Sequence, residues 1–326
     1  MTELLYAATD NGQLLPIIDI TNPAFAINIS PAELDSASGQ FVREQEQRQM
    51  TPEMREALAR SVFGSALMKA AGSYLPGIVT YRMKLGPDNL GGDAHPIDRS
   101  IASSFPAFTA RLRLQDMARL LADGIARTLT LGDSRPLCLM NIAGGPAADS
   151  WNALLLLRRQ YPDLLADRKI LLAVLDIDES GPQFGAQAVA ALCAAGAPLC
   201  GLNIHFRSIR YDWSRADALA EVSAGFRAVD AACALSSEGG LFEYASDHEI
   251  LANLKTMHLA TADDAFIVGS VTRASGAASA ANSPPVATRP HSFEGFQSLA
   301  CECGWAVEAS IERPFSFHVR LAKRPR

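Results

Sequence analysis

The sequence predicts an α/β protein with a seven-stranded, mostly parallel sheet, a closing antiparallel hairpin and a helical cap in front. From Arg135 onward, short β-like runs alternate with helical segments, as in sheets whose strands are joined by crossover helices. The last two runs are joined only by Glu312-Arg313-Pro314, which is too short for a crossover and therefore requires antiparallel pairing. We expect the cap to cover residues 1–130 and the sheet domain to cover residues 131–326.

The cap prediction depends on helix start signals and on one apolar face. Ser30-Pro31-Ala32-Glu33 combines an N-cap Ser, a first-turn Pro and a Glu at the third helical position, which together mark a helix start. Thr51-Pro52 opens a second helix that we expect to continue to Gly72. A third helix is indicated by apolar residues from Leu112 to Ile125 that fall on one face.

The sheet prediction depends on seven runs of apolar and β-branched residues. They are Leu137–Ala143, Ile170–Asp176, Leu202–Arg210, Val229–Leu235, Ala265–Val271, Trp305–Ile311 and Phe315–Leu321. Between the fourth and fifth runs, Ser246-Asp-His-Glu249 forms a capping box that predicts a helix start. Residues 274–290 are rich in Ala, Ser and Pro and predict a mobile loop before a helix at Ser292–Cys303.

Composition limits the functional classes. The net charge of −6 argues against a broad nucleic-acid-binding surface, since that affinity depends on Lys and Arg contacts to phosphate. The chain has no apolar stretch long enough to span a membrane and no leader-like start, so we expect a cytoplasmic protein with reduced thiols. Cys301-Glu-Cys303 is too short and isolated for a zinc site, and no metal is expected.

The turn after the first sheet strand is the first candidate ligand-binding element. In Asn141-Ile-Ala-Gly-Gly-Pro146, paired glycines lead from a strand into a helix. Such a turn lets backbone N–H groups approach a ligand without interference from Cβ atoms, and the helix dipole favours an electron-rich group there. A tight turn that needs small residues for packing alone is the alternative interpretation.

The second element is the acidic end of the second sheet strand. Asp176 ends that strand and Asp178 follows it, so Asp176 is placed beside the glycine turn, where it can accept hydrogen bonds from ribose hydroxyls. A cap for the next helix, or a solvent-facing carboxylate, is the alternative. A dinucleotide fingerprint is absent, because Pro146, Ala147 and Ala148 follow Gly145 with no third glycine.

With these elements, residues 135–323 resemble the class I, Rossmann-like S-adenosylmethionine-dependent methyltransferases. The resemblance implies that Ala143, Gly144 and Gly145 hold the methionine part, that Asp176 binds ribose, and that Asp212 and Trp213 meet adenine. That family usually has an acid where this chain has Asn141. The full predicted cofactor set is Asn141, Ala143, Gly144, Gly145, Asp176, Ile177, Asp178, Asp212, Trp213 and Ser236.

The segment after the fourth sheet strand contains the catalytic candidates. The resemblance places this loop beneath the transferable methyl group, where Glu238 can orient or deprotonate a nucleophile. Tyr244 and Arg273 are candidates for positioning the acceptor. Purely structural roles are the alternative for all three, with Arg273 pairing to Asp247 or Asp263.

Several other charged residues allow either a functional role or simple exposure to solvent. His291 follows the predicted loop and is either a base delivered by a lid or a solvated histidine. In the cap, Lys84, Arg111 and Arg113 either meet an acidic substrate or are simply exposed.

The sequence thus predicts a methyltransferase that uses S-adenosylmethionine and acts on a small molecule by in-line transfer. Sparse catalytic residues are compatible with this, because the sulfonium is already activated and the protein must chiefly align the reactants. A non-catalytic protein that binds S-adenosylmethionine or S-adenosylhomocysteine is the first alternative, and an NAD(P)-dependent oxidoreductase is the second.

Overall fold

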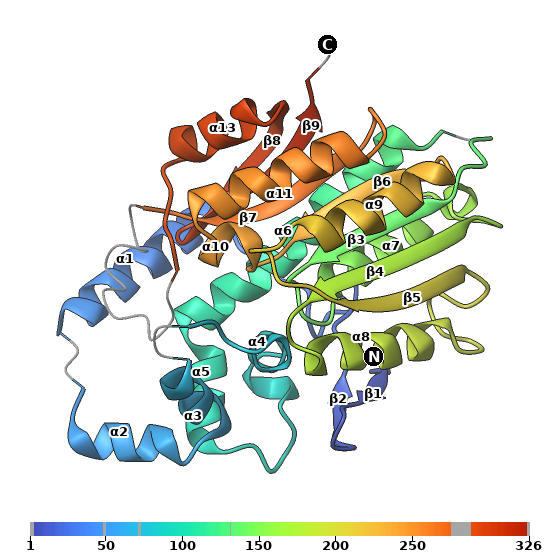
Figure 1. Ribbon diagram of the computed structural model, residues 1–326. Helices are drawn as coiled ribbons and strands as arrows, with labels where there is room; N and C mark the ends of the chain where they lie inside the picture. Colours follow the sequence, from blue (N-terminus) through green and yellow to red (C-terminus); the bar gives the residue numbers. More distant parts are fainter. Residues whose placement is uncertain (1–2, 48–49, 71–72, 131, 275–287, 325–326) are drawn as a thin grey trace.

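The computed structural model describes residues 3–47, 50–70, 73–130, 132–274 and 288–324 (Figure 1). Most of the predicted loop before the final helix, residues 275–287, lies outside these ranges.

A seven-stranded sheet forms the centre of the molecule, with the strand order β5-β4-β3-β6-β7-β9-β8. Its strands are β3 (Leu137–Ile142), β4 (Lys169–Asp176), β5 (Asn203–Arg210), β6 (Ala232–Ser237), β7 (Phe266–Thr272), β8 (Trp305–Glu312) and β9 (Ser316–Lys323). Neighbouring strands from β5 to β7 pair in parallel. Strand β9 pairs antiparallel with both β7 and β8. The predicted mostly parallel sheet and its closing antiparallel hairpin are therefore confirmed.

Helices cover both faces of the sheet, which explains why β3 and β6 are buried along their whole length. On one face lie α6 (Phe105–Thr128), α7 (Ala148–Gln160) and α8 (Ser180–Cys193), whose apolar residues share a core with β3 and β4. On the other face lie α9 (Asp217–Ala228), α10 (Leu241–Tyr244), α11 (Asp247–Ala260) and α13 (Phe293–Glu302) (Figure 1). The predicted capping box at Ser246 is present at the start of α11.

The cap consists mainly of helices that precede the sheet. They are α1 (Pro31–Gln47), α2 (Pro52–Ala59), α3 (Val62–Lys69), α4 (Gly77–Lys84), the 3₁₀ turn η1 (Pro87–Asn89), α5 (Pro96–Ser103) and α6. A second 3₁₀ turn, η2 (Pro162–Leu164), lies in the sheet domain between α7 and β4. The prediction of a single helix after Thr51 is wrong, because two helices, α2 and α3, are found there. The break lies at Ser61, which caps α3, while Asp98 accepts hydrogen bonds from the first two N–H groups of that helix.

Two further details differ from the sequence prediction. The fourth sheet strand begins at Ala232 instead of Val229, because α9 continues to Ala228 and Asp230 turns the chain with a φ of 50°. A two-stranded hairpin, β1 (Tyr6–Ala8) and β2 (Leu14–Pro16), was not expected. It lies against α8.

The cap and the sheet share one hydrophobic core. Ile17, Ile18 and Tyr81 from the cap belong to the same buried cluster as Leu139 and Leu172 of the sheet. Helix α6 packs against α7 and β7, so it joins the two parts. The division at residue 130 stays a prediction, since the buried cluster extends across it.

Candidate functional site

The candidate site lies at the carboxyl ends of β3, β4 and β6, which we call the switch point because strand order reverses there. In open α/β sheets, ligands bind outside the carboxyl ends of the strands at such a point. The turn that leaves β3 has unusual backbone geometry, with φ of 52° at Ala143, 60° at Gly145 and 63° at Ala147. Left-handed conformations at two alanines are costly, and such strain is found preferentially at functional sites.

Asp176 borders this turn as the sequence predicts. Its Oδ2 accepts a hydrogen bond from the Gly145 N–H at 3.0 Å, and its Oδ1 accepts one from the Asp178 N–H at 3.0 Å. Burial raises the pKa of Asp176, and these backbone donors partly oppose that rise. The turn and the carboxylate are therefore neighbours, but the carboxylate already satisfies the Gly145 donor.

Three glycines meet at the switch point. A Cβ added to Gly77, at the start of α4, would lie 2.5 Å from Cα of Gly145, and one added to Gly181, in α8, would lie 2.8 Å from the same atom. Asp178 Oδ2 accepts a hydrogen bond from the Gly77 N–H at 3.2 Å. The small residues of this turn thus allow the backbone of the cap to rest directly on it. Ile177, beside the two aspartates, is half-buried.

Asn141 lies in a buried polar cluster beneath the turn. Its Nδ2 donates to Asp149 Oδ1 at 2.7 Å and to Ser236 Oγ at 3.1 Å. Asn141 Oδ1 and Asp149 Oδ2 are buried without a hydrogen-bond partner among the described residues. Burial, followed by the charge of Glu238, raises the pKa of Asp149 to about 6. Gly144 is close above this cluster, since its Cβ would lie 2.2 Å from Asn141 Oδ1.

Glu238 is held by two cations of the cap. Lys84 Nζ, at the end of α4, lies 2.6 Å from Glu238 Oε1, and Arg113 Nε, in α6, lies 3.2 Å from the same oxygen. Arg113 also reaches Glu243 Oε1 at 2.5 Å. The Glu238 side chain is 1% exposed. The interpretation of Lys84 and Arg113 as solvent-exposed charges is therefore wrong. Both meet acidic groups of their own chain.

Burial opposes the charge of Arg113, and its two carboxylate partners outweigh that effect. Burial alone lowers the pKa of Arg113, while the charges of Glu243 and Glu238 raise it to a net value above the usual range. Arg113 therefore stays charged in this buried network.

An aromatic cluster lies beside these charges. The ring of Tyr74, in the segment before α4, meets Trp213 edge-on at 6.1 Å and Tyr244 at 6.5 Å between centroids. Burial, with help from the charge of Glu243, raises the pKa of Tyr244. Asp212 is exposed and accepts a hydrogen bond from the Ser214 N–H, which lowers its pKa. Trp213 and Tyr244 therefore approach the same cap residue, whereas Asp212 faces solvent.

Arg273 makes its contacts at the hairpin of β8 and β9. It pairs with Glu312 at 2.8 Å, donates to the Arg313 carbonyl and stacks on Phe317. Arg273 therefore has a structural ion pair, but its partner is Glu312 and not Asp247 or Asp263, which were the alternatives considered from sequence. Asp247 instead lies 3.0 Å from Nε2 of His291.

A second buried cluster has the hydrogen-bond order of a nucleophilic triad. Ser316 Oγ lies 2.8 Å from His318 Nε2, and His318 Nδ1 lies 3.1 Å from Asp116 Oδ2. Arg313 binds both oxygens of the same carboxylate at 2.7 and 3.0 Å. Because Ser316 and His318 are almost fully buried and this ion pair occupies the acid, we assign the cluster the role of joining α6 to β9.

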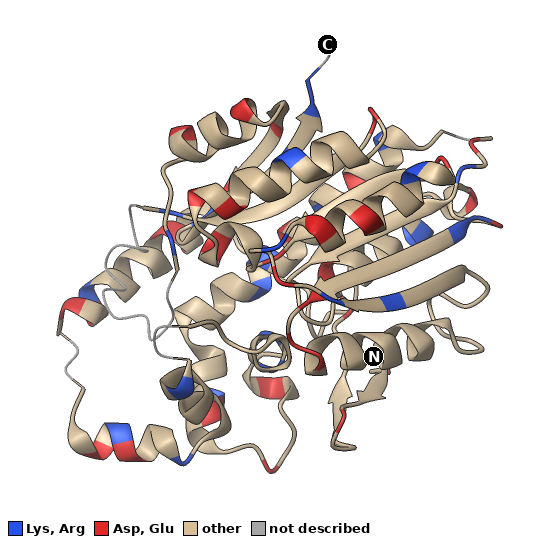
Figure 2. Cartoon of the chain, viewed as in Figure 1, with Lys and Arg blue, Asp and Glu red and all other residues tan. Residues whose placement is uncertain are grey.

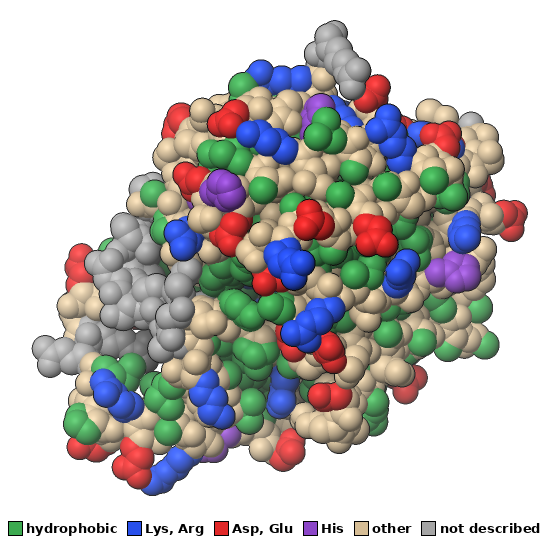
Figure 3. Space-filling model, in the orientation of Figure 1, with side chains coloured by type: hydrophobic (Ala, Val, Ile, Leu, Met, Phe, Trp, Pro, Cys, Tyr) green, Lys and Arg blue, Asp and Glu red, His purple; other side chains and the backbone are tan. Residues whose placement is uncertain are grey.

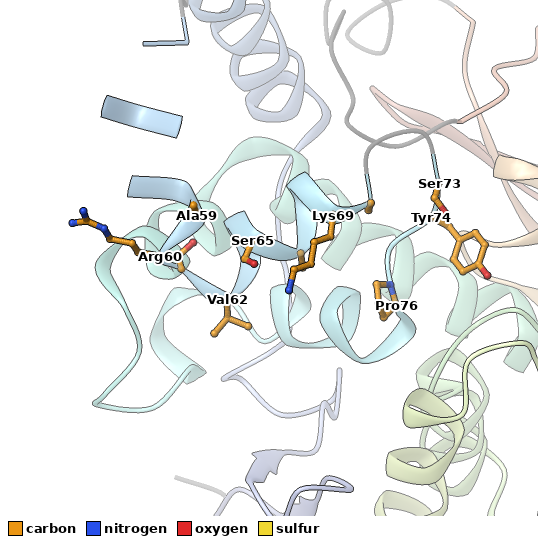
Figure 4. A pocket seen from close by; sticks show the side chains of 11 residues that line it. Ala59, Arg60, Val62, Ser65, Lys69, Ser73, Tyr74 and Pro76 are labelled. Atoms are coloured by element: carbon orange, nitrogen blue, oxygen red, sulfur yellow. The ribbon is translucent and has the colours of Figure 1, made fainter. Parts of the chain in front are cut away.

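A cavity of about 550 Å³ lies in the cap, beside the switch point. Val62, Ser65 and Lys69 line it from α3, and Tyr74 and Pro76 line it from the segment before α4 (Figure 4). Tyr74 therefore borders both this cavity and the aromatic cluster. A second cavity of about 440 Å³ is lined by Gln115 and Arg313, away from the switch point.

The surface adds two observations. Acidic and basic residues are interspersed along the helices in Figure 2. In Figure 3, hydrophobic side chains gather along the boundary between cap and sheet domain. No helix in the described ranges combines the length and hydrophobicity that a bilayer span requires.

Comparison with known proteins identifies the fold. No family model matches the chain, and no curated protein is significantly similar in sequence. A possible exported protein from Bordetella parapertussis matches over 92% of this chain and 100% of its own, with a TM-score of 0.56 and 19% identity. At that identity the likeness shows the fold.

Many other similar structures are S-adenosylmethionine-dependent methyltransferases that act on small molecules. Magnesium protoporphyrin IX methyltransferase from Synechocystis, solved with S-adenosylhomocysteine, covers 68% of this chain and 88% of its own (TM-score 0.44, 12% identity). Mitomycin 7-O-methyltransferase covers 98% and 79% (TM-score 0.43, 13% identity).

Proposed function

We propose that this chain binds S-adenosylmethionine at the switch point and transfers its methyl group to a small-molecule acceptor. The observation that carries the proposal is the 3.0 Å approach of the Asp176 carboxylate to the Gly145 N–H at the carboxyl ends of adjacent parallel strands. A glycine turn and a carboxylate in this arrangement provide a place for an amino-acid group and for ribose hydroxyls.

The buried polar atoms fit this ligand. Asn141 Oδ1 and Asp149 Oδ2 are acceptors without a partner in the described part of the chain, and they lie beneath the turn expected to hold the methionine part. A ligand ammonium donates to such acceptors, and its charge favours the ionised form of Asp149. Asp176 would accept from ribose hydroxyls, because each of its two oxygens has a second lone pair beside the one that faces its backbone donor.

The residues beneath the expected methyl position serve orientation more readily than proton transfer. S-adenosylmethionine, when bound, supplies an already activated methyl group. Glu238 Oε1 already accepts from Lys84 Nζ and Arg113 Nε, so this oxygen is occupied and the side chain is held in one orientation. In this arrangement Glu238 orients a donor group of the acceptor, and Tyr244 lies close enough to Arg113 for charge interaction in the same region.

A thermal-shift panel with S-adenosylmethionine, S-adenosylhomocysteine, NADH and NADPH tests the cofactor. A ligand that binds only the folded state at one hundred times its Kd stabilises that state by about 2.7 kcal/mol, so we expect a clear rise in Tm with the two sulfur compounds.

Asp176→Asn should weaken binding roughly 10- to 100-fold, since a hydrogen bond to a charged group contributes about 1.5–3 kcal/mol. The exposed Asp163→Asn is the matched control. A shift with a nicotinamide alone would overturn the proposal.

A non-catalytic binding protein is the second candidate function. The observation that favours it is Asn141 in place of the acid that methyltransferases usually have at this position. Incubation with methyl-labelled S-adenosylmethionine and a panel of hydroxyl, amine and thiol acceptors separates the two. Binding without formation of S-adenosylhomocysteine across the panel would favour the second candidate.

A further inference from the structure

The chain segment Ser73–Gly77 occupies the switch point. Its contacts fall on residues predicted to hold the ligand. Tyr74 meets Trp213, the Gly77 backbone lies against Gly145, and the Gly77 N–H donates to Asp178. A cofactor bound by Gly145, Asp178 and Trp213 would have to take the volume that this segment fills.

This segment is held weakly. Tyr74 is 38% exposed, and the Gly77–Asp178 hydrogen bond is long at 3.2 Å. The first turn of α4 follows Pro76, which provides no side-chain cap. The side-chain acceptor at this helix start is instead Asp178, from the sheet domain. Loss of a capping side chain destabilises a helix start by about 1 kcal/mol, so the first turn of α4 depends on a contact that a ligand bound to Asp178 would remove.

The remainder of α4 is fixed. Tyr81 is buried, donates to the Pro16 carbonyl at 2.8 Å and accepts from the Ile18 N–H at 2.9 Å. Its ring packs against Phe184 at 4.8 Å between centroids. Lys84 is anchored at the end of the helix by its ion pair with Glu238. These contacts anchor α4 from Tyr81 onward, so we expect any opening of the helix start to end before Tyr81.

We infer that Ser73–Gly77 is an intramolecular plug that competes with S-adenosylmethionine for the switch point, while Tyr81–Leu85 remains in place as a wall. The inference rests on the proposed function. The apparent affinity for the cofactor is then reduced by the fraction of molecules in which the plug is closed. When the plug leaves, Asp178 and the Gly145 surface become available together.

Gly77→Ala tests the plug, because a Cβ at this position meets Gly145 Cα at 2.5 Å and forces the segment away. We expect S-adenosylhomocysteine to bind this variant about tenfold more tightly than the wild type in calorimetry, as the closed fraction falls. Tyr74→Ala, which removes the aromatic contacts and leaves the backbone unchanged, should act in the same direction. Gly92→Ala is the matched control in the cap, since nothing lies within 4 Å of its Cβ.

Hydrogen exchange gives a readout that does not depend on catalysis. A plug that the ligand displaces predicts faster amide exchange in residues 73–80 when S-adenosylhomocysteine is added, together with slower exchange in the turn at 143–146. A lid that closes over the ligand predicts slower exchange in both. Slower exchange in both segments, or equal affinity in all four proteins, would overturn the plug and leave the proposed function standing.

Failure of the proposed function gives a different result. If Gly77→Ala speeds exchange in residues 73–80 but neither it nor Tyr74→Ala binds S-adenosylhomocysteine, the cofactor assignment is wrong, and competition with that cofactor is excluded as well.

Discussion

Asp149 is a fully buried carboxyl group whose protonation is linked to folding. Burial and the nearby Glu238 raise its pKa to about 6, so the folded protein holds this proton more tightly than the unfolded chain does. The contribution to stability is fully present below the unfolded pKa, near 4, and is lost as pH rises through about 6. Two pKa units correspond to a change on the order of 3 kcal/mol.

The Asp149→Asn variant should lack this pH dependence. We expect its free energy of unfolding relative to wild type to increase by about 2.5 kcal/mol between pH 4 and pH 7.5, because only the wild type loses the proton-linked term. Urea unfolding at both pH values measures it, with Asp163→Asn as the control for removing an exposed carboxyl group. A constant difference between variant and wild type would contradict the raised pKa.

Much of the site was predictable at the residue scale because it depends on local sequence. Gly145 follows one apolar strand and Asp176 ends its neighbour, and parallel strands bring their carboxyl ends to one edge. Gly77 was missed as a site residue, and the pairing of Lys84 and Arg113 with acids of the same chain was not predicted, because these contacts depend on tertiary packing. Lys84 and Glu238, for example, are 154 residues apart. The spacing of Ile78, Tyr81 and Leu85 was a signal that α4 buries one face.

At the scale of elements, α6 and β9 are joined by one buried carboxylate. Asp116 binds Arg313 through both oxygens and also contacts His318. Burial raises the pKa of Asp116, but its hydrogen bonds with His318 and Arg313 outweigh that effect and leave the pKa below its ordinary value. The pKa of His318 is also below its ordinary value, in this case because burial disfavours the charged imidazolium. Both shifts withdraw stability as pH falls, which is opposite in sign to the effect of Asp149.

Asp116→Ala should therefore be strongly destabilising. Removing one partner leaves the Arg313 charge and a buried imidazole uncompensated, and such losses cost roughly 3–5 kcal/mol. Glu56→Ala, which breaks the exposed pair with Arg60, should cost less than about 1 kcal/mol. Denaturant unfolding of the two variants beside wild type measures the contrast, and equal small losses would show that the α6–β9 cluster contributes little.

The elements themselves were predicted unevenly from sequence. Strands such as β3 and β4 are recognisable as uninterrupted apolar runs. The break between α2 and α3 was not, because the acceptor for the first N–H groups of α3 is Asp98, far along the chain. The hairpin of β1 and β2 has only three residues in each strand, and periodicity cannot identify elements of that length.

At the scale of the whole molecule, the cap and the sheet should unfold together. Ile18 and Tyr81 of the cap lie in one buried cluster with Leu139 and Leu172 of the sheet, and residues that share a core lose their packing at the same time. We expect a single calorimetric transition whose van't Hoff and calorimetric enthalpies agree. Two separated transitions would show that the cap is an independent domain.

The position of β9 inside the sheet has a consequence for synthesis. Strand β7 is buried and apolar, and its antiparallel neighbour is β9, which follows only after α13 and β8. Once the ribosome has synthesised β7, one edge of this apolar strand therefore stays unpaired until β8 and β9 have been made. Unpaired strand edges are templates for unwanted association. A pause in translation between Thr272 and Ser316 would therefore lengthen the time during which β7 can aggregate or bind a chaperone.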